Sequence, residues 1–251
     1  RPPGEPRTSA GGRRGSTAAG SGGVWSRLRS ATILAGAVAR GVEFKLLVDG
    51  AAELEALARA AGARGARAAA PLVQVNHFLD TAGGGLRSRD GLLRLRQEEQ
   101  RWTLAAKGPG EQAGLLHRRA ELEVEVGADD AARMLAGELD PLRELERRLG
   151  PHELLASLER GRGAERLVPI GALVNERTRV GPLACEGAGR ELWLELDRTL
   201  LPGGLWNYEI ELEVPEGAEA AAERLLGELC AAAGVRGRPA ASKAARFFES
   251  L

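Results

Sequence analysis

The segment Tyr208-Glu209-Ile210-Glu211-Leu212-Glu213-Val214 alternates three glutamates with apolar residues. Successive side chains of a β-strand point to opposite faces of the sheet, so the glutamates share one face and the apolar residues share the other. Such a strand fits an antiparallel sheet with one face in water, and it also fits a closed barrel whose charged side chains point inward. Which of these two arrangements applies decides the fold.

The same alternation recurs along the chain, and each segment carries mostly one sign of charge. Like charges at neighbouring positions repel, so a solvated sheet tends to mix signs. The segregation therefore favours a barrel interior with a basic wall and an acidic wall. The cationic pairs are Arg94 with Arg96 and Arg177 with Arg179; the carboxylate groups are Glu121, Glu123 and Glu125, then Glu195 and Asp197, then Glu209 and Glu211.

A basic wall facing an acidic wall suggests a site for a phosphate-bearing anion. Arginine and lysine bind phosphate oxygens, and carboxylates bind divalent cations that bridge to the same oxygens. The chain has only two cysteines and three histidines, so its oxygen ligands suit Mg²⁺ or Mn²⁺ rather than zinc. It contains no Gly-x-x-x-x-Gly-Lys-Ser/Thr loop, so a P-loop nucleotide site is not supported.

Hydrophobic periodicity and turn residues predict a mainly β (α+β) fold with about eight antiparallel strands and helices between and after them. A closed barrel would remove the unpaired edges of such a sheet, although periodicity alone does not establish closure. The predicted strands are 42–48, 72–80, 91–97, 101–107, 119–126, 167–180, 191–198 and 205–214. The predicted helices are 51–61, 129–158 with breaks at Pro141 and Pro151, 215–233 and 241–251.

Composition limits the classes of partner. Residues 1–40 carry seven arginines and one acidic residue, which leaves 28 basic and 34 acidic residues in the remainder. This mildly acidic remainder argues against nonspecific nucleic-acid binding. The longest apolar run, residues 31–38, is far shorter than the roughly 20 residues of a membrane-spanning helix, so no membrane partner is expected. The sequence indicates no oligomeric state.

Residues 1–40 form a predicted extension ahead of one domain over residues 41–251. The extension is rich in Arg, Ser, Gly and Ala and poor in acids, which is typical of transit peptides of the chloroplast or another organelle. A disordered tail or an error in the upstream gene structure would give the same composition. A cytoplasmic protein is the alternative location.

The charged segments, taken in order, resemble the triphosphate tunnel metalloenzyme superfamily, whose domain is also called CYTH. Each motif is weak alone, but all occur in the family's order from Val42 to the C-terminus, with most similarity to plant-type inorganic tripolyphosphatase-like members. The motifs are Val42-Glu43-Phe44-Lys45, Gln74 to Thr81, Leu93-Arg94-Leu95-Arg96, Thr103 to Lys107, Glu121 to Glu125, Asn175-Glu176-Arg177, Leu194-Glu195-Leu196-Asp197, Tyr208-Glu209-Ile210-Glu211 and Ser242-Lys243.

The resemblance implies an eight-stranded antiparallel closed tunnel barrel that hydrolyses a linear triphosphate, most favourably inorganic tripolyphosphate, with Mg²⁺ or Mn²⁺. Glu43 and Lys45 are the implied catalytic residues, and Glu121 and Glu213 are expected at the tunnel rim. The implied substrate-binding residues are Lys45, Arg94, Arg96, Lys107, Arg177, Arg179 and Lys243. The implied metal ligands are Glu43, Glu123, Glu125, Glu195, Asp197, Glu209 and Glu211.

One position departs from the family pattern, because Gly41 stands where the first glutamate of the Glu-x-Glu-x-Lys signature is expected. Loss of that carboxylate could lower turnover while triphosphate binding remains. Thiamine triphosphatase and class IV-type adenylate cyclase are alternative activities. A noncatalytic polyphosphate- or nucleotide-binding module and a purely structural sheet are the alternatives outside the enzymes.

Overall fold

The computed structural model describes residues 39–251 of the chain. Strand β1 (Ala39–Val48) starts three residues before the predicted Val42. The transit-peptide-like extension predicted over residues 1–40 therefore lies outside the described residues, apart from its last two positions.

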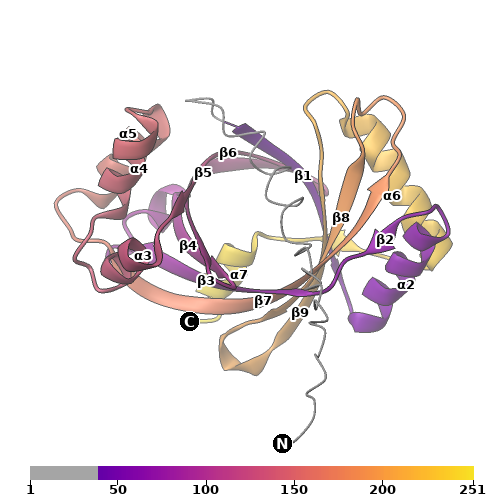
Figure 1. Cartoon of the computed structure of the whole chain (residues 1–251), viewed down its shortest axis with the longest axis horizontal. Helices are drawn as coiled ribbons and strands as arrows, with labels where there is room; N and C mark the ends of the chain where they lie inside the picture. The colour runs from indigo at the N-terminus through magenta and orange to yellow at the C-terminus, as the bar shows by residue number, and fades with distance from the viewer. Residues whose placement is uncertain (1–38) are drawn as a thin grey trace, which may run out of the picture. The chain divides into compact units, whose positions relative to one another are not determined.

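Eight strands within residues 39–251 form a closed antiparallel ring in the order β1-β6-β5-β4-β3-β7-β8-β9, and β9 pairs back with β1 (Figure 1). This confirms the predicted closed barrel. Two short strands lie outside the ring: β2 (Arg67–Ala68) pairs with β7, and β10 (Arg238–Pro239) pairs with β1. The remaining ring strands are β3 (Leu72–Asp80), β4 (Leu92–Glu98), β5 (Arg101–Ala113), β6 (Leu116–Val126), β7 (Val168–Leu183), β8 (Leu192–Leu200) and β9 (Trp206–Glu213).

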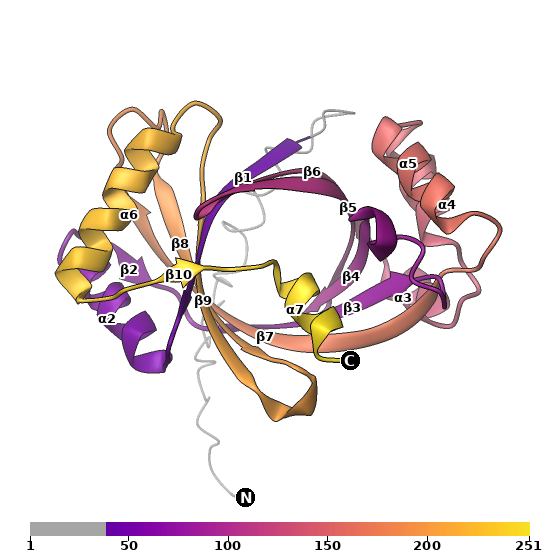
Figure 2. The same cartoon turned by 180° about the vertical axis from the view of Figure 1, so that it is seen from behind.

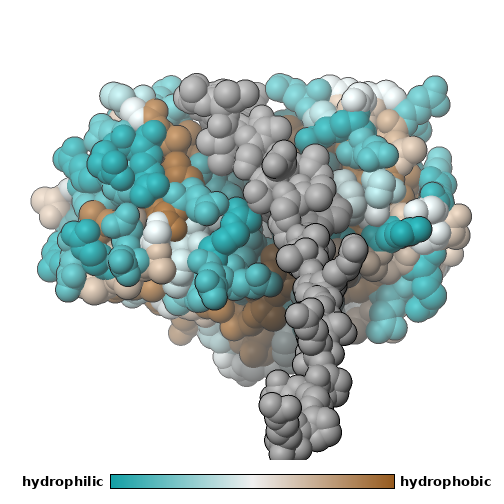
Figure 3. Space-filling model, viewed as in Figure 1, coloured by the Kyte–Doolittle hydropathy of each residue, from teal (hydrophilic) through white to brown (hydrophobic). Residues whose placement is uncertain are grey.

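The outer face of the barrel is apolar and is covered by helices on two sides. Helices α2 (Ala51–Gly62) and α6 (Glu219–Ala233) pack on β1, β8 and β9, where Phe44 and Leu212 are buried. Helices α3 (Ala128–Leu135), α4 (Pro141–Leu149) and α5 (Glu153–Arg162) cover β4 to β6 on the other side. Hydrophilic side chains dominate both flanks of the face in Figure 3, so the helices turn their polar sides to water. The hydrophobic effect thus holds the apolar strand face outward and the charged face inward.

The predicted helical stretch 129–158 is three separate helices. Proline begins a helix easily, because its missing N–H would be unpaired there anyway. Pro141 is accordingly the first residue of α4, and the carboxylate of Asp140 accepts hydrogen bonds from the amides of Leu142 and Arg143. Pro151 precedes α5, whose N-terminus is capped by His152 through the amide of Leu154.

Helix α7 (Lys243–Glu249) lies across one opening of the barrel (Figure 2). Its Phe247 packs against Phe78, an inward-facing residue of β3, with ring centroids 4.7 Å apart. Gly171 permits this approach, because a Cβ atom there would lie 2.6 Å from the Phe247 ring. The C-terminal helix therefore covers part of one opening of the barrel and is held there by an aromatic cluster.

Candidate functional site

The strands turn the charged positions of the sequence toward the barrel interior. Because side chains alternate, the apolar neighbours of these residues are buried under the helices outside. Helix α7 adds Lys243 from the end of the barrel that this helix crosses. The inward-facing set includes Glu43, Lys45, Arg94, Arg96, Lys107, Glu121, Glu123, Arg177, Arg179, Glu195, Asp197, Glu209 and Glu211.

Arg177 is the centre of a buried ion-pair cluster. Strand β7 pairs with β8, which places Arg177 directly opposite Asp197. The guanidinium donates from Nε to Asp197 Oδ1 at 2.8 Å and from Nη2 to Oδ2 at 2.6 Å, and it also bonds to Glu195 and Glu211. Burial alone would lower the pKa of Arg177, but these three carboxylates raise it well above its usual value. The arginine is therefore permanently charged and fully neutralised.

Two lysines complete the neutralisation of the acidic strands. Lys45 Nζ lies 2.5 Å from Glu211 Oε1 and 3.1 Å from Glu43 Oε1. Lys243 Nζ lies 2.8 Å from the same Glu211 oxygen and 2.7 Å from Asp197 Oδ2. Burial would raise the pKa of Asp197, but Arg177 and Lys243 lower it to about 2. Burial likewise disfavours the charged form of Lys45, yet Glu211, Glu43 and Glu209 raise its pKa.

Two walls of opposite charge were expected, and the strand order contradicts this. The arginine strand β7 lies beside the acidic strand β8, with Arg177 opposite Asp197 and Arg179 opposite Glu195. Cations and carboxylates on this side of the barrel are consequently interleaved. Each strand carries mostly one sign of charge, but the two signs do not collect on opposite walls, because the ring places the basic strand β7 next to the acidic strand β8.

On the other side of the interior, formed by β4 to β6, the arginines lie farther from their carboxylate partners. Lys107 Nζ lies 2.9 Å from Glu121 Oε2, and Arg94 lies 3.8 Å from Glu121 and 3.6 Å from Glu123. Burial lowers the pKa of Lys107, and the attraction of Glu121 does not offset it because Arg94 and Lys45 repel the ammonium group. Arg96 donates to Asn76 Oδ1 at 3.0 Å and lies 3.5 Å from Glu98 Oε1. The pKa of Lys107 is thus lowered, whereas neighbouring carboxylates raise the pKa of Lys45 and of Lys243, so an added anion would stabilise Lys107 most.

Two of the sequence expectations, for Glu125 and Glu121, differ from the positions in the barrel, and Arg179 lies on the inward face as expected. Glu125, an expected metal ligand, lies at the exposed end of β6, with its side chain 64% exposed and paired with Arg101 at 3.1 Å. Glu121, expected at the rim, lies inside the barrel with Lys107. Arg179 lies with its guanidinium over the ring of Trp193, 5.2 Å from the centroid, and 3.5 Å from Glu195.

Sequence reasoning missed Arg246 and His117. Arg246 of α7 is buried and bonds to Glu209, while Lys243 lies 3.2 Å from that carboxylate. The helical spacing of three residues between Lys243 and Arg246 was the available signal. His117 lies opposite Glu43 across β1 and β6, and burial, followed by the charge of Lys45, lowers its pKa. No strand motif marks this histidine.

The donor set on β8 and β9 fits a hard divalent cation. Glu209 is fully buried, and its Oε1 atom has no hydrogen-bond partner, so a cation could satisfy it. Carboxylate oxygens are the ligands that Mg²⁺ and Mn²⁺ prefer. Within residues 39–251, however, no three potential ligands are already gathered around one point. The carboxylates lie on Lys45, Arg177, Lys243 and Arg246, so a bound metal would have to displace part of these ion pairs.

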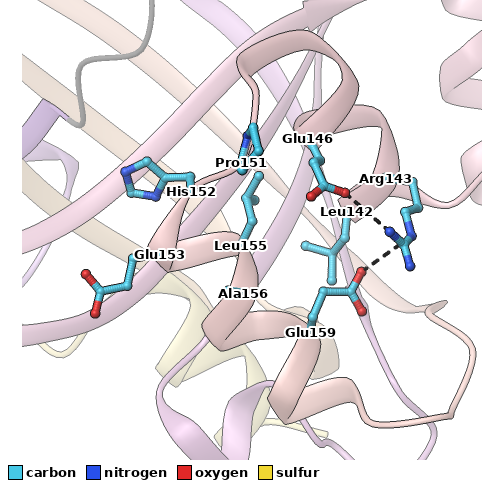
Figure 4. Close-up of a pocket in the computed structure, with 9 residues that line it drawn as sticks. All are labelled: Leu142, Arg143, Glu146, Pro151, His152, Glu153, Leu155, Ala156 and Glu159. Atoms are coloured by element: carbon cyan, nitrogen blue, oxygen red, sulfur yellow. Dashed lines mark hydrogen bonds and ion pairs between the residues drawn. The ribbon is translucent and has the colours of Figure 1, made fainter.

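A separate pocket lies outside the barrel, between α4 and α5 (Figure 4). Its volume is about 510 Å³, and Arg143 crosses it to pair with Glu146 at 3.3 Å and Glu159 at 4.0 Å. His152 lines the pocket, but its Nδ1 caps α5. The pocket therefore does not bring together the charged residues of the barrel interior.

The ionised carboxylate of Glu121 is expected to stabilise the fold near neutral pH and to lose this contribution in acid. Burial would raise its pKa, but Lys107 and Arg94 lower it from 4.5 to about 2. A lowered folded-state pKa contributes stability above about pH 4.5 that is lost as the pH falls toward 2. The variant Glu121→Gln should therefore be less stable than wild type at pH 7, by at most about 3 kcal/mol, with a difference that shrinks below about pH 4.5.

Urea unfolding at pH 7 and at about pH 3.5 measures this difference. Glu125→Gln on the same strand is the matched control, and it should change the unfolding free energy by less than about 1 kcal/mol because surface pairs contribute little. A Glu121→Gln difference that stays constant with pH would contradict the expectation.

The closed antiparallel barrel with an interior of paired cations and carboxylates is matched by a known family. Residues 39–248 match the CYTH domain, and the chain therefore belongs to the CYTH domain family. No helix among residues 39–251 has the length and apolar character needed to span a membrane. Among curated proteins, none matches the chain.

Solved structures share the fold. HpAC1 from Hippeastrum, described as an adenylyl cyclase candidate with a dominant triphosphatase activity, is 23% identical over 83% of this chain and 95% of HpAC1, with a TM-score of 0.67. A candidate adenylate cyclase from Bacillus halodurans is 23% identical over 82% of this chain and 96% of its own, with a TM-score of 0.57. PH1819 from Pyrococcus horikoshii is 18% identical over 84% and 99%, with a TM-score of 0.53.

Proposed function

We propose that this protein is a metal-dependent triphosphatase that hydrolyses the terminal phosphate of a linear triphosphate, with inorganic tripolyphosphate as the favoured substrate. The observation that supports this best is the interior side formed by β4 to β6. There, Arg94 and Lys107 share Glu121, and the charge of this carboxylate does not offset the effect of burial on the pKa of Lys107, which is lowered. A polyanion stabilises such cations by charge-assisted hydrogen bonds. The activity described for HpAC1, which has the same fold, agrees with this choice.

In this proposal, some interior residues bind the phosphates and others hold the acidic strands in position. Arg94, Arg96 and Lys107 hold phosphate oxygens on one side of the barrel. Arg177 stays bonded to Asp197 and holds the acidic strands in place, and Arg179 lies farther along the same strand. Lys45 and Lys243 exchange their carboxylate partners for phosphate oxygens when the substrate enters. Phosphoryl transfer needs mainly this positioning and charge stabilisation.

Glu43 is the proposed acceptor of the proton from the attacking water. Its carboxylate projects from β1 into the barrel and lies 3.1 Å from Lys45 Nζ. The water oxygen forms a bond to the terminal phosphorus, the bridging P–O bond breaks, and the shorter phosphate leaves. A Mg²⁺ or Mn²⁺ ion held by Asp197, Glu209 and Glu211, with Glu195 beside them, would neutralise phosphate charge. Roles for Glu123 and Glu125 as metal ligands remain predictions, and the exposed place of Glu125 gives it little support.

A substrate panel tests the proposal. Phosphate release by the purified protein is measured with tripolyphosphate, ATP and thiamine triphosphate, each with Mg²⁺, with Mn²⁺ and with EDTA. We expect metal-dependent release, fastest from tripolyphosphate. No release from any substrate would defeat the hydrolase proposal. Chromatography of the ATP reaction separates cyclic AMP and pyrophosphate, the products of a cyclase, from ADP and phosphate.

Trp193 supports a second candidate, the hydrolysis of an organic triphosphate. It lies on the same face of β8 as Glu195 and Asp197, so its ring belongs to the interior face. An aromatic ring there could stack on a base or on the thiamine heterocycle, and stacking contributes about 1–3 kcal/mol per base. Trp193→Ala should then raise KM about tenfold or more for ATP or thiamine triphosphate and leave KM for tripolyphosphate within about twofold. Equal effects on all substrates would contradict this role.

Gly41→Glu tests whether the missing signature carboxylate limits turnover. A Cβ at position 41 would have only ordinary contacts, 3.7 Å from the Arg119 carbonyl oxygen and 3.8 Å from Glu121 Oε2, so glutamate fits. We expect the added carboxylate to raise kcat with Mn²⁺ by about tenfold, the scale of metal-tuning residues. Gly41→Gln, which adds the same bulk without the charge, is the control. Tight tripolyphosphate binding without turnover in wild type and in Gly41→Glu would favour the noncatalytic binding module.

A further inference from the structure

Arg119 lies on the inward face of β6, one strand repeat from Glu121. Its neighbours on both flanking strands are glycines, because Gly41 of β1 and Gly110 of β5 are its register partners. A Cβ at Gly110 would lie 3.6 Å from the Arg119 side chain, so this glycine faces the same side. At these two flanking positions, therefore, no side chain of β1 or β5 covers Arg119.

The Arg119 guanidinium is oriented by backbone carbonyl groups. Nη2 donates to the carbonyl oxygen of Asp90 at 2.6 Å, and Nε donates to the carbonyl oxygen of Gly108. Its hydrogen-bond partners are thus backbone carbonyls, which fix its direction without supplying a negative charge. Burial lowers its pKa, and the more distant carboxylates of Glu121 and Asp90 do not offset this. Arginine has five N–H donors, so a fixed guanidinium retains donors for an anion.

Arg119 continues the row of cations on the side of the interior formed by β4 to β6. Glu121, the carboxylate shared by Lys107 and Arg94, lies two residues farther along β6, or about 6.8 Å along the strand. Arg119 is therefore placed to reach a phosphate group beyond the ones that Lys107 and Arg94 contact. A longer phosphate chain would span both positions.

We infer that Arg119, set between Gly41 and Gly110, forms an additional anion subsite that takes one end of a linear chain of three or more phosphates. This inference rests on the proposed function, since it extends the same interior site. The subsite selects for chain length: tripolyphosphate reaches it, whereas pyrophosphate is held by the other interior cations without a contact to Arg119.

Calorimetric titration in EDTA, where no hydrolysis occurs, tests the subsite with tripolyphosphate and pyrophosphate. Arg119→Met should raise the Kd of tripolyphosphate about tenfold or more and leave the Kd of pyrophosphate within about twofold. Arg118→Met is the matched control, because Arg118 is the adjacent residue, faces outward and pairs with Glu219 at 2.9 Å. That variant should bind both anions as wild type does.

The outcomes separate the two proposals. If wild type binds neither anion and releases no phosphate, the proposed function fails. If wild type binds tripolyphosphate and Arg119→Met binds it equally well, or loses both anions equally, the subsite is overturned. Arg119→Lys keeps the charge but loses the fork of donors, so it should bind tripolyphosphate more weakly than wild type even if Arg119→Met does not fold. Wild-type affinity of Arg119→Lys would also overturn the subsite.

Discussion

Arg177→Met is expected to lower the free energy of unfolding by about 3–5 kcal/mol, because it leaves three buried carboxylates without their shared cation. Asp197 is fully buried and takes two hydrogen bonds from Arg177, and Glu195 and Glu211 are buried beside it. For a domain of this size the loss corresponds to a fall in Tm of roughly 6–20 °C. Thermal and urea unfolding measure both quantities.

The same variant should recover part of its stability in acid. Without Arg177, the uncompensated carboxylates bind protons more readily in the folded state, so the deficit relative to wild type should shrink as the pH falls. Arg101→Met is the control, because Arg101 pairs with exposed Glu125 on the surface and should contribute less than about 1 kcal/mol. If the two variants were equally stable, the cluster around Arg177 would not hold the barrel together.

Glu211→Gln is expected to lower kcat/KM for tripolyphosphate by about 100-fold or more, the scale of losing one charge-stabilising group of an active site. Glu211 is the carboxylate on which Lys45, Lys243 and Arg177 converge. Those cations lower its pKa well below the usual value although burial opposes ionisation, so it is charged at all ordinary pH values. The glutamine keeps the shape and removes the charge. The metal concentration for half-maximal activity should rise in parallel.

Glu213→Gln is the matched control for Glu211→Gln. It lies two residues farther along β9 and is exposed. We expect its kcat/KM to stay within about threefold of wild type. The two variants are compared at several Mg²⁺ and Mn²⁺ concentrations after their folding is checked by circular dichroism. Equal activity of both variants would remove Glu211 from the proposed site.

Much of the site could be predicted because strand periodicity is a local property. The alternation at Val42-Glu43-Phe44-Lys45 assigns Phe44 to one face and Lys45 to the other, and the structure buries Phe44 under α2 and α6 while Lys45 reaches Glu211. Alternation does not predict how far along the barrel axis a side chain lies, and therefore whether it is inside the barrel or at its exposed end. Glu121 and Glu125 are equivalent in pattern, yet Glu121 meets Lys107 inside and Glu125 meets Arg101 at the surface.

The sequence by itself determined that eight alternating strands turn charge to one face, and the order of their motifs identified the family. Only the tertiary structure decided which charges meet. It placed β7 against β8, so that Arg177 lies on Asp197, and it brought α7 across the barrel, so that Lys243 and Arg246 reach Glu209. It also set Arg119 between two glycines from different strands. The physical reason is that side-chain alternation repeats every two residues, whereas neighbours around a closed barrel depend on strand order and register between distant segments.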